Sequence, residues 1–263
     1  MRRNLRLIWL LIRYKFAHMM AFQWSFWGVF FADGALFLVQ LLAFETIYSQ
    51  VDGIGGWSRG QMIIFVGTFS MINALNMLIY FFGILSLPSK IRQGDLDLYL
   101  TKPMNPLLRL TFESVNIGSL PLVALSALII GYGVKTAGLQ VTLWGGLGYA
   151  ALVLLMTLLW YDMELILRTI CFFVLSAKGI EGLEGLLLDL NFKVPGVLYK
   201  GAFKLLFYFV LPYGLMSTIP TQFIAGGIDG LPLAVAVLTV VGFTAFALRF
   251  WKFGLRHYKS ASS

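Results

Sequence analysis

The sequence contains few charged residues and a single cysteine. Of its 263 residues, 12% are charged and 59% are hydrophobic, whereas soluble domains carry about 25% charged and about 45–50% apolar residues. This composition excludes an ordinary soluble domain and predicts an integral membrane protein. Cys171 lies in the apolar run TICFFVLS, so a disulfide within the chain is excluded and we expect a packing role for this residue.

Signatures of catalysis and of nucleotide or metal binding are also missing. The chain has no G-x-x-x-x-G-K-[ST] sequence to bind nucleotide phosphates, and no G-x-S-x-G or Ser/His/Asp arrangement. Its two histidines, His18 and His257, have no cysteine or carboxylate nearby at metal-ligand spacing. We therefore expect no catalytic residue, no metal site and no cofactor bound by this chain.

Six apolar stretches are long enough to cross a bilayer, because a spanning helix needs roughly 20 mostly apolar residues. Open sheets cannot cross lipid with satisfied backbones, so the predicted fold class is an all-α integral membrane protein with one transmembrane domain over residues 1–263. The predicted spans cover residues 24–47, 61–86, 110–132, 141–165, 201–219 and 231–251.

Lysine and arginine are distributed unevenly between the predicted loops. They gather before the first span, between spans two and three, between spans four and five, and after span six, whereas the other loops offer only Arg59 and Lys135. By the positive-inside rule both termini are expected in the cytoplasm, which accounts for the net charge of +8 without nucleic acid as a partner. Residues 1–22 mix basic and apolar side chains and predict an interfacial amphipathic helix.

Residues 162–200 are too many for a simple turn and too charged for another span. We expect them to form a cytoplasmic extension of the fourth span and then an interfacial amphipathic helix. The expected wet side of this helix holds Glu181, Glu184 and Asp189, and its apolar side holds Leu183 and residues 186–188.

Residues 212–230 combine two prolines with four glycines and contain no lysine or arginine. Irregular backbone at membrane depth is tolerated only where it is buried in protein or lines a cavity. We therefore expect a broken or re-entrant segment on the extracellular side, after the fifth span. An ordinary extracellular loop is the alternative.

Polar side chains within the predicted spans are candidates for a substrate pathway or for pairing between helices. Glu164 and Arg168 lie four residues apart with the acid first, which is the favoured order for an ion pair within a helix. Asp33 has no partner nearby in sequence, so both roles stay open for it. The complete set is Asp33, Asn73, Asn76, Asp162, Glu164 and Arg168.

Residues 88–106, between the second and third predicted spans, are both charged and apolar. Leu96, Leu100 and Met104 share one face of a predicted short helix, and this face would be wet unless a partner covered it. Such a helix could dock in a groove of a soluble protein, with its charges setting the register. A solvated loop is the alternative.

The stretch IRQGDLDLYLTKPMNPL resembles the I-x-x-G-x-L-D-x-Y-L-x-K-P-x-N-P sequence of one branch of bacterial ABC type-2 exporter permeases. The segments VPGVLYKGAFKLLFYFVLPYGLMSTIP and LRFWKFGLRHYKSASS are similar to the fifth span and the C-terminus of that branch. The resemblance covers most of the chain, and the first motif is its most specific part.

The resemblance implies a permease subunit of an ATP-binding cassette exporter in the bacterial inner membrane. Two permease subunits, with a heterodimer slightly favoured over a homodimer, would form the pathway in the lipid. Two copies of a separate ATPase would bind underneath and carry ATP and Mg. A non-transporting scaffold or sensor that recruits a soluble partner through the same loop is the alternative.

The resemblance also implies that residues 90–106 couple the permease to the ATPase. In this interpretation, the charged side chains pair with the ATPase surface, two leucines fill its groove, and a glycine and a proline shape the ends of the segment. The implied coupling residues are Arg92, Gly94, Asp95, Leu96, Asp97, Leu100, Lys102 and Pro103.

Overall fold

The computed structural model describes residues 7, 10, 13, 23–174 and 178–258, and the described part of the chain is helical and contains no strand. This confirms the predicted all-α integral membrane fold. The predicted interfacial helix over residues 1–22 lies outside the described residues, apart from Leu7, Leu10 and Arg13.

Five long helices are apolar enough to cross a membrane over most of their length. They are α2 (Gln23–Tyr48), α3 (Arg59–Ile79), α8 (Leu120–Thr136), α9 (Leu143–Thr169) and α14 (Gly230–His257). The shorter elements are α4 (Phe81–Leu85), α5 (Leu87–Gln93), α6 (Asp97–Leu100), α7 (Pro106–Phe112), η1 (Ile117–Ser119), η2 (Ile170–Phe172), α10 (Lys178–Lys193), η3 (Gly196–Leu198), α11 (Gly201–Leu205), η4 (Leu206–Val210), α12 (Tyr213–Met216) and α13 (Thr218–Ile224).

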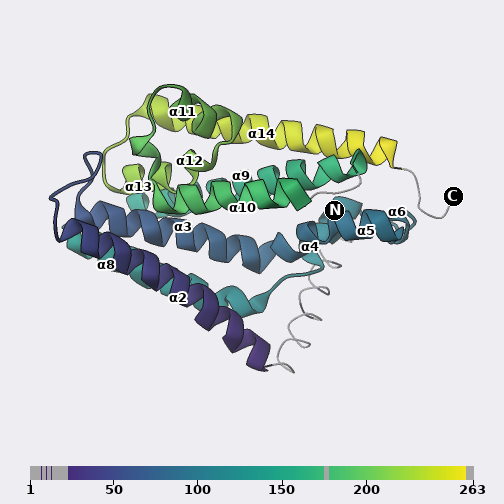
Figure 1. The fold of residues 1–263 in the computed structure, drawn as a ribbon, viewed down its shortest axis with the longest axis horizontal. Helices are drawn as coiled ribbons and strands as arrows, with labels where there is room; N and C mark the ends of the chain where they lie inside the picture. Colours follow the sequence, from purple (N-terminus) through teal and green to yellow (C-terminus); the bar gives the residue numbers. More distant parts are fainter. Residues whose placement is uncertain (1–6, 8–9, 11–12, 14–22, 175–177, 259–263) are drawn as a thin grey trace.

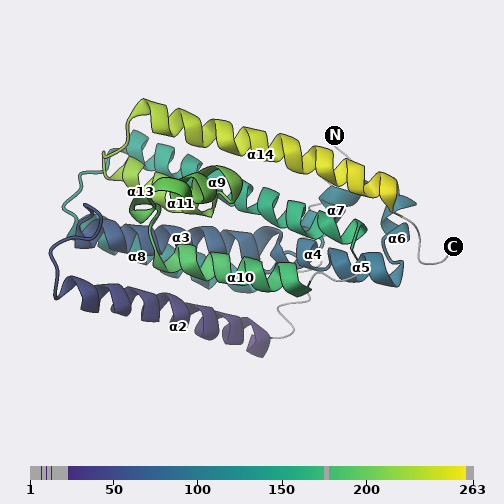
Figure 2. The same ribbon diagram turned by 45° about the horizontal axis from the view of Figure 1, so that its top comes forward.

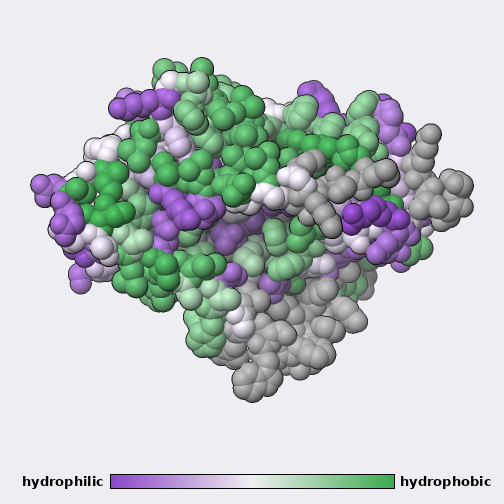
Figure 3. Space-filling view, in the orientation of Figure 1, coloured by the Kyte–Doolittle hydropathy of each residue, from purple (hydrophilic) through white to green (hydrophobic). Residues whose placement is uncertain are grey.

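The long helices lie side by side in one elongated bundle (Figures 1 and 2). Two ends of the bundle can be distinguished, the α5–α6 end and the opposite end, where the α2–α3 loop and α13 lie. Helices α2 and α8 run toward the opposite end, and α3, α9 and α14 return from it. Apolar side chains cover much of the bundle surface, while polar ones gather at its ends and in a depression across one face (Figure 3). This distribution is typical of a protein surrounded by lipid.

Helices α3 and α8 pack against each other at unusually short range because glycines face the partner backbone. A Cβ atom on Gly133 would lie 2.8 Å from the backbone nitrogen of Ile64, and one on Gly67 would lie 2.9 Å from that of Ile130. Small residues at helix contacts let backbones approach closely in lipid, where van der Waals packing drives helix association. The backbones of α3 and α8 therefore lie close together at these two glycines.

Helix α10, for which the sequence analysis expected an interfacial position, runs along the bundle. It lies parallel to the long helices in both views (Figures 1 and 2). Near its end, Phe192 stacks on Phe69 of α3 with ring centroids 4.7 Å apart. A few residues later, Val197 packs in a cluster with Trp57 at the start of α3, at the opposite end. Helix α10 thus runs from the α5–α6 end of the bundle to the opposite end.

The burial pattern of α10 also differs from the expected one. Glu184, expected on the wet side, is buried, whereas Leu183 and Leu186, expected on the apolar side, are exposed. Asp189 is exposed, as expected, and the side chain of Glu181 lies outside the described part. The helix therefore turns one carboxylate into the protein and two leucines outward.

The predicted fifth span over residues 201–219 is not a continuous helix. It consists of α11 with the π-helix η4, which is mostly exposed, and then α12 with α13, bent by 82° from the first arm. The bend falls at Leu211 and Pro212, because proline disfavours the helical conformation of the residue before it and lacks an N–H donor of its own. The prediction of a broken segment is thus confirmed. The break lies within the predicted fifth span, residues 201–219, and not after it.

The second arm of this hairpin, α12 with α13, is part of the protein core rather than an ordinary loop. Tyr213, Met216 and Ile219 are buried in the main apolar cluster. The hairpin also packs on the end of α10, where Gly196 donates a hydrogen bond to Thr218 Oγ1 at 2.9 Å. Such packing satisfies the requirement that irregular backbone at membrane depth be covered by protein.

Three lysines that the sequence analysis grouped with the basic residues of the α5–α6 end lie at the opposite end of the bundle. Lys193, Lys200 and Lys204 follow or end α10, so they do not belong with the basic residues of the α5–α6 end, as the sequence pattern had indicated. The excess of basic residues at the α5–α6 end is consequently smaller than the sequence suggests.

Gly133→Ala is expected to lower the free energy of unfolding by about 1–3 kcal/mol, the usual cost of overpacking, because the new Cβ meets the backbone of α3. Gly131→Ala on the same helix is the matched control, since nothing lies within 4 Å of its Cβ position. Cys171, the single cysteine and a buried one, provides the measurement through its reactivity with a thiol dye on heating. Equal unfolding midpoints for the two variants would contradict the close packing.

Candidate functional site: the α5–α7 segment and the charged residues behind it

The α5–α7 segment, residues 87–112, owes its compact shape to a glycine and an asparagine. Helix α5 ends at Gly94, whose φ of 78° is left-handed, and the N–H of Leu96 then bonds to the carbonyl of Lys90 at 3.3 Å. Helix α7 is capped by Asn105, which accepts a hydrogen bond from the N–H of Leu107 at 2.9 Å. The chain therefore reverses twice within a short distance and returns to the bundle.

The α5–α7 segment is held together by a charged cluster that the sequence analysis missed. The hydroxyl of buried Tyr99 donates to both carboxylate oxygens of Glu113 at 2.7 Å. Lys90 Nζ lies 3.2 Å and Arg109 Nε 3.6 Å from the same carboxylate. Arg109 also lies over the ring of Tyr99, with 3.9 Å between its Cζ and the ring centroid. These contacts join α5, α6 and α7 to the residue directly after α7.

Burial and the hydrogen bond to Glu113 raise the pKa of Tyr99. Its phenol therefore keeps its proton and remains a donor to Glu113 throughout the physiological pH range. The sequence does contain one sign of this cluster. Leu96 and Tyr99 lie three residues apart, a spacing that places both on one face of a helical turn, and both are buried.

The prediction that Leu96 fills a groove of a partner is wrong, because Leu96 is buried within the protein. Its side chain is 0% exposed and packs in a cluster with Tyr80, Leu165 and Trp251, which come from three other parts of the bundle. Leu98, which the prediction left out, is 58% exposed, and the predicted Leu100 is 43% exposed. The apolar side chains available to a partner are therefore Leu98 and Leu100, while Leu96 anchors the segment to the core.

The remaining predicted coupling residues lie mostly on the surface. Arg92, Asp95, Lys102 and Pro103 are exposed, and Asp97 is half-buried. We use the name outer face for five exposed residues of the segment: Arg92, Asp95, Leu98, Leu100 and Lys102. This surface presents two apolar side chains among charges of both signs, a combination that suits a protein groove.

A buried ion-pair cluster ties α9 to α10. Arg168 Nη2 lies 2.7 Å from a carboxylate oxygen of Glu184 and 3.3 Å from one of Glu164. The indole N–H of Trp160 donates to Glu164 at 3.3 Å. All three charged side chains are buried, so the pairing predicted for Glu164 and Arg168 is present and gains a second acid from α10.

The other predicted intramembrane polar residues are not joined to this cluster by any hydrogen bond or ion pair that the described residues form. Asp33 is half-buried on α2, and Asn73 and Asn76 lie on α3, with Asn76 buried. Asp162 is buried on another face of α9, where it accepts a hydrogen bond from Thr244 of α14. The six residues therefore do not form one continuous polar pathway.

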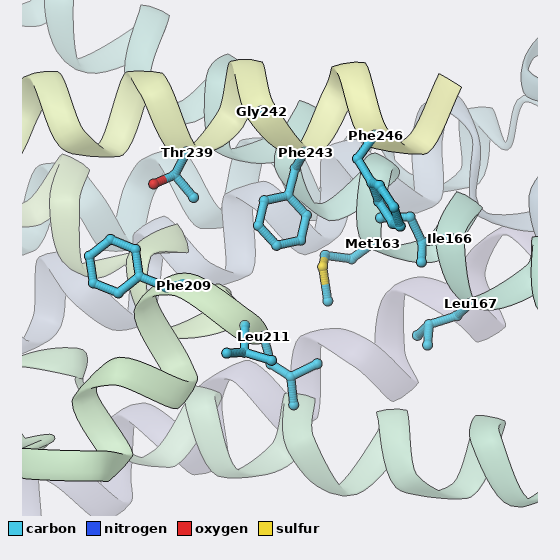
Figure 4. Close-up of a pocket in the computed structure, with 10 residues that line it drawn as sticks. Met163, Ile166, Leu167, Phe209, Leu211, Thr239, Gly242, Phe243 and Phe246 are labelled. Carbon is cyan, nitrogen blue, oxygen red and sulfur yellow. The ribbon is translucent and has the colours of Figure 1, made fainter. Parts of the chain in front are cut away.

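Two hollows flank the contact between α9 and α14. One has a volume of about 580 Å³, and in Figure 4 side chains of the hairpin face those of the two helices across it. It is lined by Met163, Ile166, Leu167, Phe209, Val210, Leu211, Thr239, Gly242, Phe243 and Phe246. The other, of about 420 Å³, lies on the side of α4 and α7 and includes Asp162. Within the described ranges, no group of three His, Cys, Asp or Glu residues could hold a metal ion.

Comparison with known proteins gives one match. The sequence model of a family described as ABC-2 family transporter protein matches residues 35–262. Neither the curated proteins nor the solved structures include a significant match to the chain.

Tyr99→Phe is expected to loosen the α5–α7 segment, because it removes a hydrogen bond to a charged group worth about 1.5–3 kcal/mol. Cleavage by trypsin after Lys90 and Arg92 should then become about tenfold faster or more, since local opening exposes these bonds. Tyr132→Phe on α8 is the matched control and should leave the cleavage rate unchanged. Cleavage of Tyr99→Phe at the wild-type rate would show that the cluster does not hold the segment.

Arg168→Gln should lower the free energy of unfolding by about 3–5 kcal/mol, because two buried carboxylates lose their counter-ion. Lys193→Gln removes a lysine from an exposed ion pair with Asp189 and should cost less than about 1 kcal/mol. The measurement is the temperature at which half of each variant is lost from the monodisperse peak in size-exclusion chromatography. Similar losses for both variants would refute a structural role for the buried cluster.

Proposed function

Because the chain belongs to the ABC-2 family of transporter proteins and is thus a membrane permease of ABC transporters, we propose that it is one permease subunit of an exporter driven by a separate ATPase. In this proposal it forms half of the substrate pathway. The proposal has three parts: the α5–α7 segment receives the ATPase, the pathway needs a second permease subunit, and the α5–α6 end faces the cytoplasm. Because a transporter family accounts for the chain, a non-transporting scaffold is not retained.

The outer face of the α5–α7 segment supports the proposal for ATPase binding. Leu98 and Leu100 lie at the α5–α6 end of the bundle, away from the candidate membrane spans, and are exposed. Exposed leucines beside Arg92 and Asp95 suit a groove on a soluble partner, with the charges fixing the register. An ATPase is the partner that an ABC permease requires.

Movement at the outer face has a direct route into the bundle. Leu96 is buried against residues of α9 and α14, and Tyr99 is fastened to Glu113, which leads into η1 and α8. A segment held at several points moves as one body rather than flexing, because packed cores are not continuously deformable. Displacement of the outer face would therefore reach α8, α9 and α14 together.

The complete complex is proposed to contain two permease subunits and two ATPase subunits, with ATP and Mg held by the ATPases. The resemblance of the loop motif favours export, and it slightly favours two different permease subunits. Basic residues at the α5–α6 end, such as Lys90, Arg92 and Lys252, support a cytoplasmic position for this end in the bacterial inner membrane.

Leu98→Asp and Arg92→Glu test the docking surface. Each should reduce the ATPase activity of the reconstituted complex by about tenfold or more, since loss of a central interface anchor costs at least about 1.4–2 kcal/mol. Val141→Asp is the matched control, because it places the same charge on an exposed apolar position in the α8–α9 loop at the opposite end.

The partner is identified first, by purifying the chain from its native membrane in mild detergent and identifying the co-purified proteins by mass spectrometry. An ATPase at equal stoichiometry that is lost with Leu98→Asp and retained with Val141→Asp is the expected result. Retention of the ATPase and its activity in both outer-face variants would refute docking at this surface.

A further inference from the structure

A hollow at the α5–α6 end of the bundle is lined by basic and apolar side chains together. Its volume is about 390 Å³, and pockets that bind small molecules typically measure about 300–1,000 Å³. The described residues that line it are Leu7, Leu10, Lys102, Pro103, Met104 and Arg109. Two of these side chains are cations and none is an acid, so the hollow attracts anions.

Lys102 carries one of the two charges. It lies in the loop between α6 and α7 and is exposed. Within the described part of the chain its side chain forms no ion pair, whereas Lys90 and Arg109 both contact Glu113. The ammonium group of Lys102 is therefore available to a ligand.

Arg109 carries the second charge and is held in a fixed orientation. Its Nε lies 3.6 Å from the carboxylate of Glu113, and its Nη1 donates to the carbonyl of Leu98 at 3.2 Å. The guanidinium also lies over the ring of Tyr99. These contacts leave Nη2 without a hydrogen bond to any described residue, and the side chain is 22% exposed. A guanidinium fixed in this way, with donors to spare, suits a phosphate group.

The charges beside the hollow do not balance. Lys90 and Arg109 share the carboxylate of Glu113, so these three side chains together carry one excess positive charge. Lys102 adds a second. The two aspartates of the α5–α7 segment do not line the hollow. A phosphate ester bound between Lys102 and Arg109 would neutralise part of this excess.

The rest of the wall is apolar and indicates what the phosphate is attached to. Leu7 and Leu10 lie three positions apart, a spacing that places both on one face of a helical turn. Leu10 is 47% exposed, and Met104 is half-buried. A free phosphate ion gains nothing from such a wall, whereas a phospholipid carries its phosphate next to apolar chains.

The hollow also lies at the level where lipid head groups are expected. Arg109 belongs to α7, which leads through a few residues into the candidate span Ile117–Thr136. Basic pockets just outside the spanning segments bind the head groups of anionic lipids. Its place along the chain therefore agrees with its charge and its apolar wall.

We propose that this hollow binds an anionic phospholipid, with the phosphate between Lys102 and Arg109 and the acyl chains along Leu7 and Leu10. The bound lipid fastens the loop between α6 and α7 to the membrane surface. A soluble phosphate ester offers the same phosphate chemistry without the chains, so the experiment separates the two sources. The inference depends neither on the direction of transport nor on an ATPase, and the full-length chain alone can test it.

Dioleoylphosphatidylglycerol is the probe, titrated against the purified chain in detergent, with bound lipid counted by native mass spectrometry. Dioleoylphosphatidylcholine has the same chains and no net charge, and it should bind at least about fivefold more weakly. Lys102→Gln should raise the Kd for phosphatidylglycerol about fivefold, because one lysine beside an anionic head group contributes about 1 kcal/mol. Its Kd for phosphatidylcholine should not change.

Arg92→Gln is the matched control, because it removes an exposed cation of the same segment that does not line the hollow. It should change the Kd for phosphatidylglycerol less than about twofold. Equal affinities of the wild type and Lys102→Gln for phosphatidylglycerol, or equal losses in the two variants, would overturn the proposal.

sn-Glycerol 3-phosphate and Leu10→Gln identify the source of the phosphate. If a tenfold excess of sn-glycerol 3-phosphate leaves phosphatidylglycerol bound, and Leu10→Gln weakens the binding of this lipid, the site is a lipid site. If sn-glycerol 3-phosphate displaces the lipid and Leu10→Gln has no effect, the hollow recognises a soluble phosphate ester, and the lipid proposal is wrong.

Discussion

The ion pair between Arg168 and Glu184 decides the course of the second half of the chain. It draws a helix of low hydropathy, α10, into the bundle beside α9. Helix α10 ends at the end of the bundle opposite α5 and α6, and α14 begins at that same end. The residues between the two helices must therefore start and finish on one side of the bundle. A hairpin that enters the core and returns is the path that meets this condition while burying apolar side chains such as Met216 and Ile219.

The parts of the fold that depend on local sequence could be predicted, and those that depend on distant pairs could not. Five spans follow from apolar runs of sufficient length. Helix α10 was misread because Glu184 counts as a wet residue until Arg168, sixteen positions earlier, neutralises it. Conversely, residues 201–219 are apolar enough for a span, and the length criterion does not register the break at Pro212. The proline and glycine content of the following residues did indicate irregular structure.

The α5–α7 segment shows the same limit on a smaller scale. A continuous helix would place Leu96 and Leu100 on one face, but Gly94 reverses the chain and α6 is a single turn. Within that turn Leu96 and Tyr99 point inward, and Leu98 points outward. The spacing of Leu96 and Tyr99 indicates a shared face, but the partner that holds Tyr99 inward, Glu113, lies fourteen residues away. The motif therefore predicts a short segment at the surface of the bundle, but not which of its side chains are exposed.

Glu184 has a consequence for how the protein is made. A charged carboxylate at the centre of a lone helix opposes its transfer from the translocon into lipid by about 2.5–3.5 kcal/mol. Helix α9 precedes α10 in synthesis, and its Arg168 can neutralise that carboxylate only if α9 is still beside the nascent helix. The ion pair removes this penalty only where α9 and α10 lie side by side, so the carboxylate of Glu184 makes the placement of α10 depend on α9.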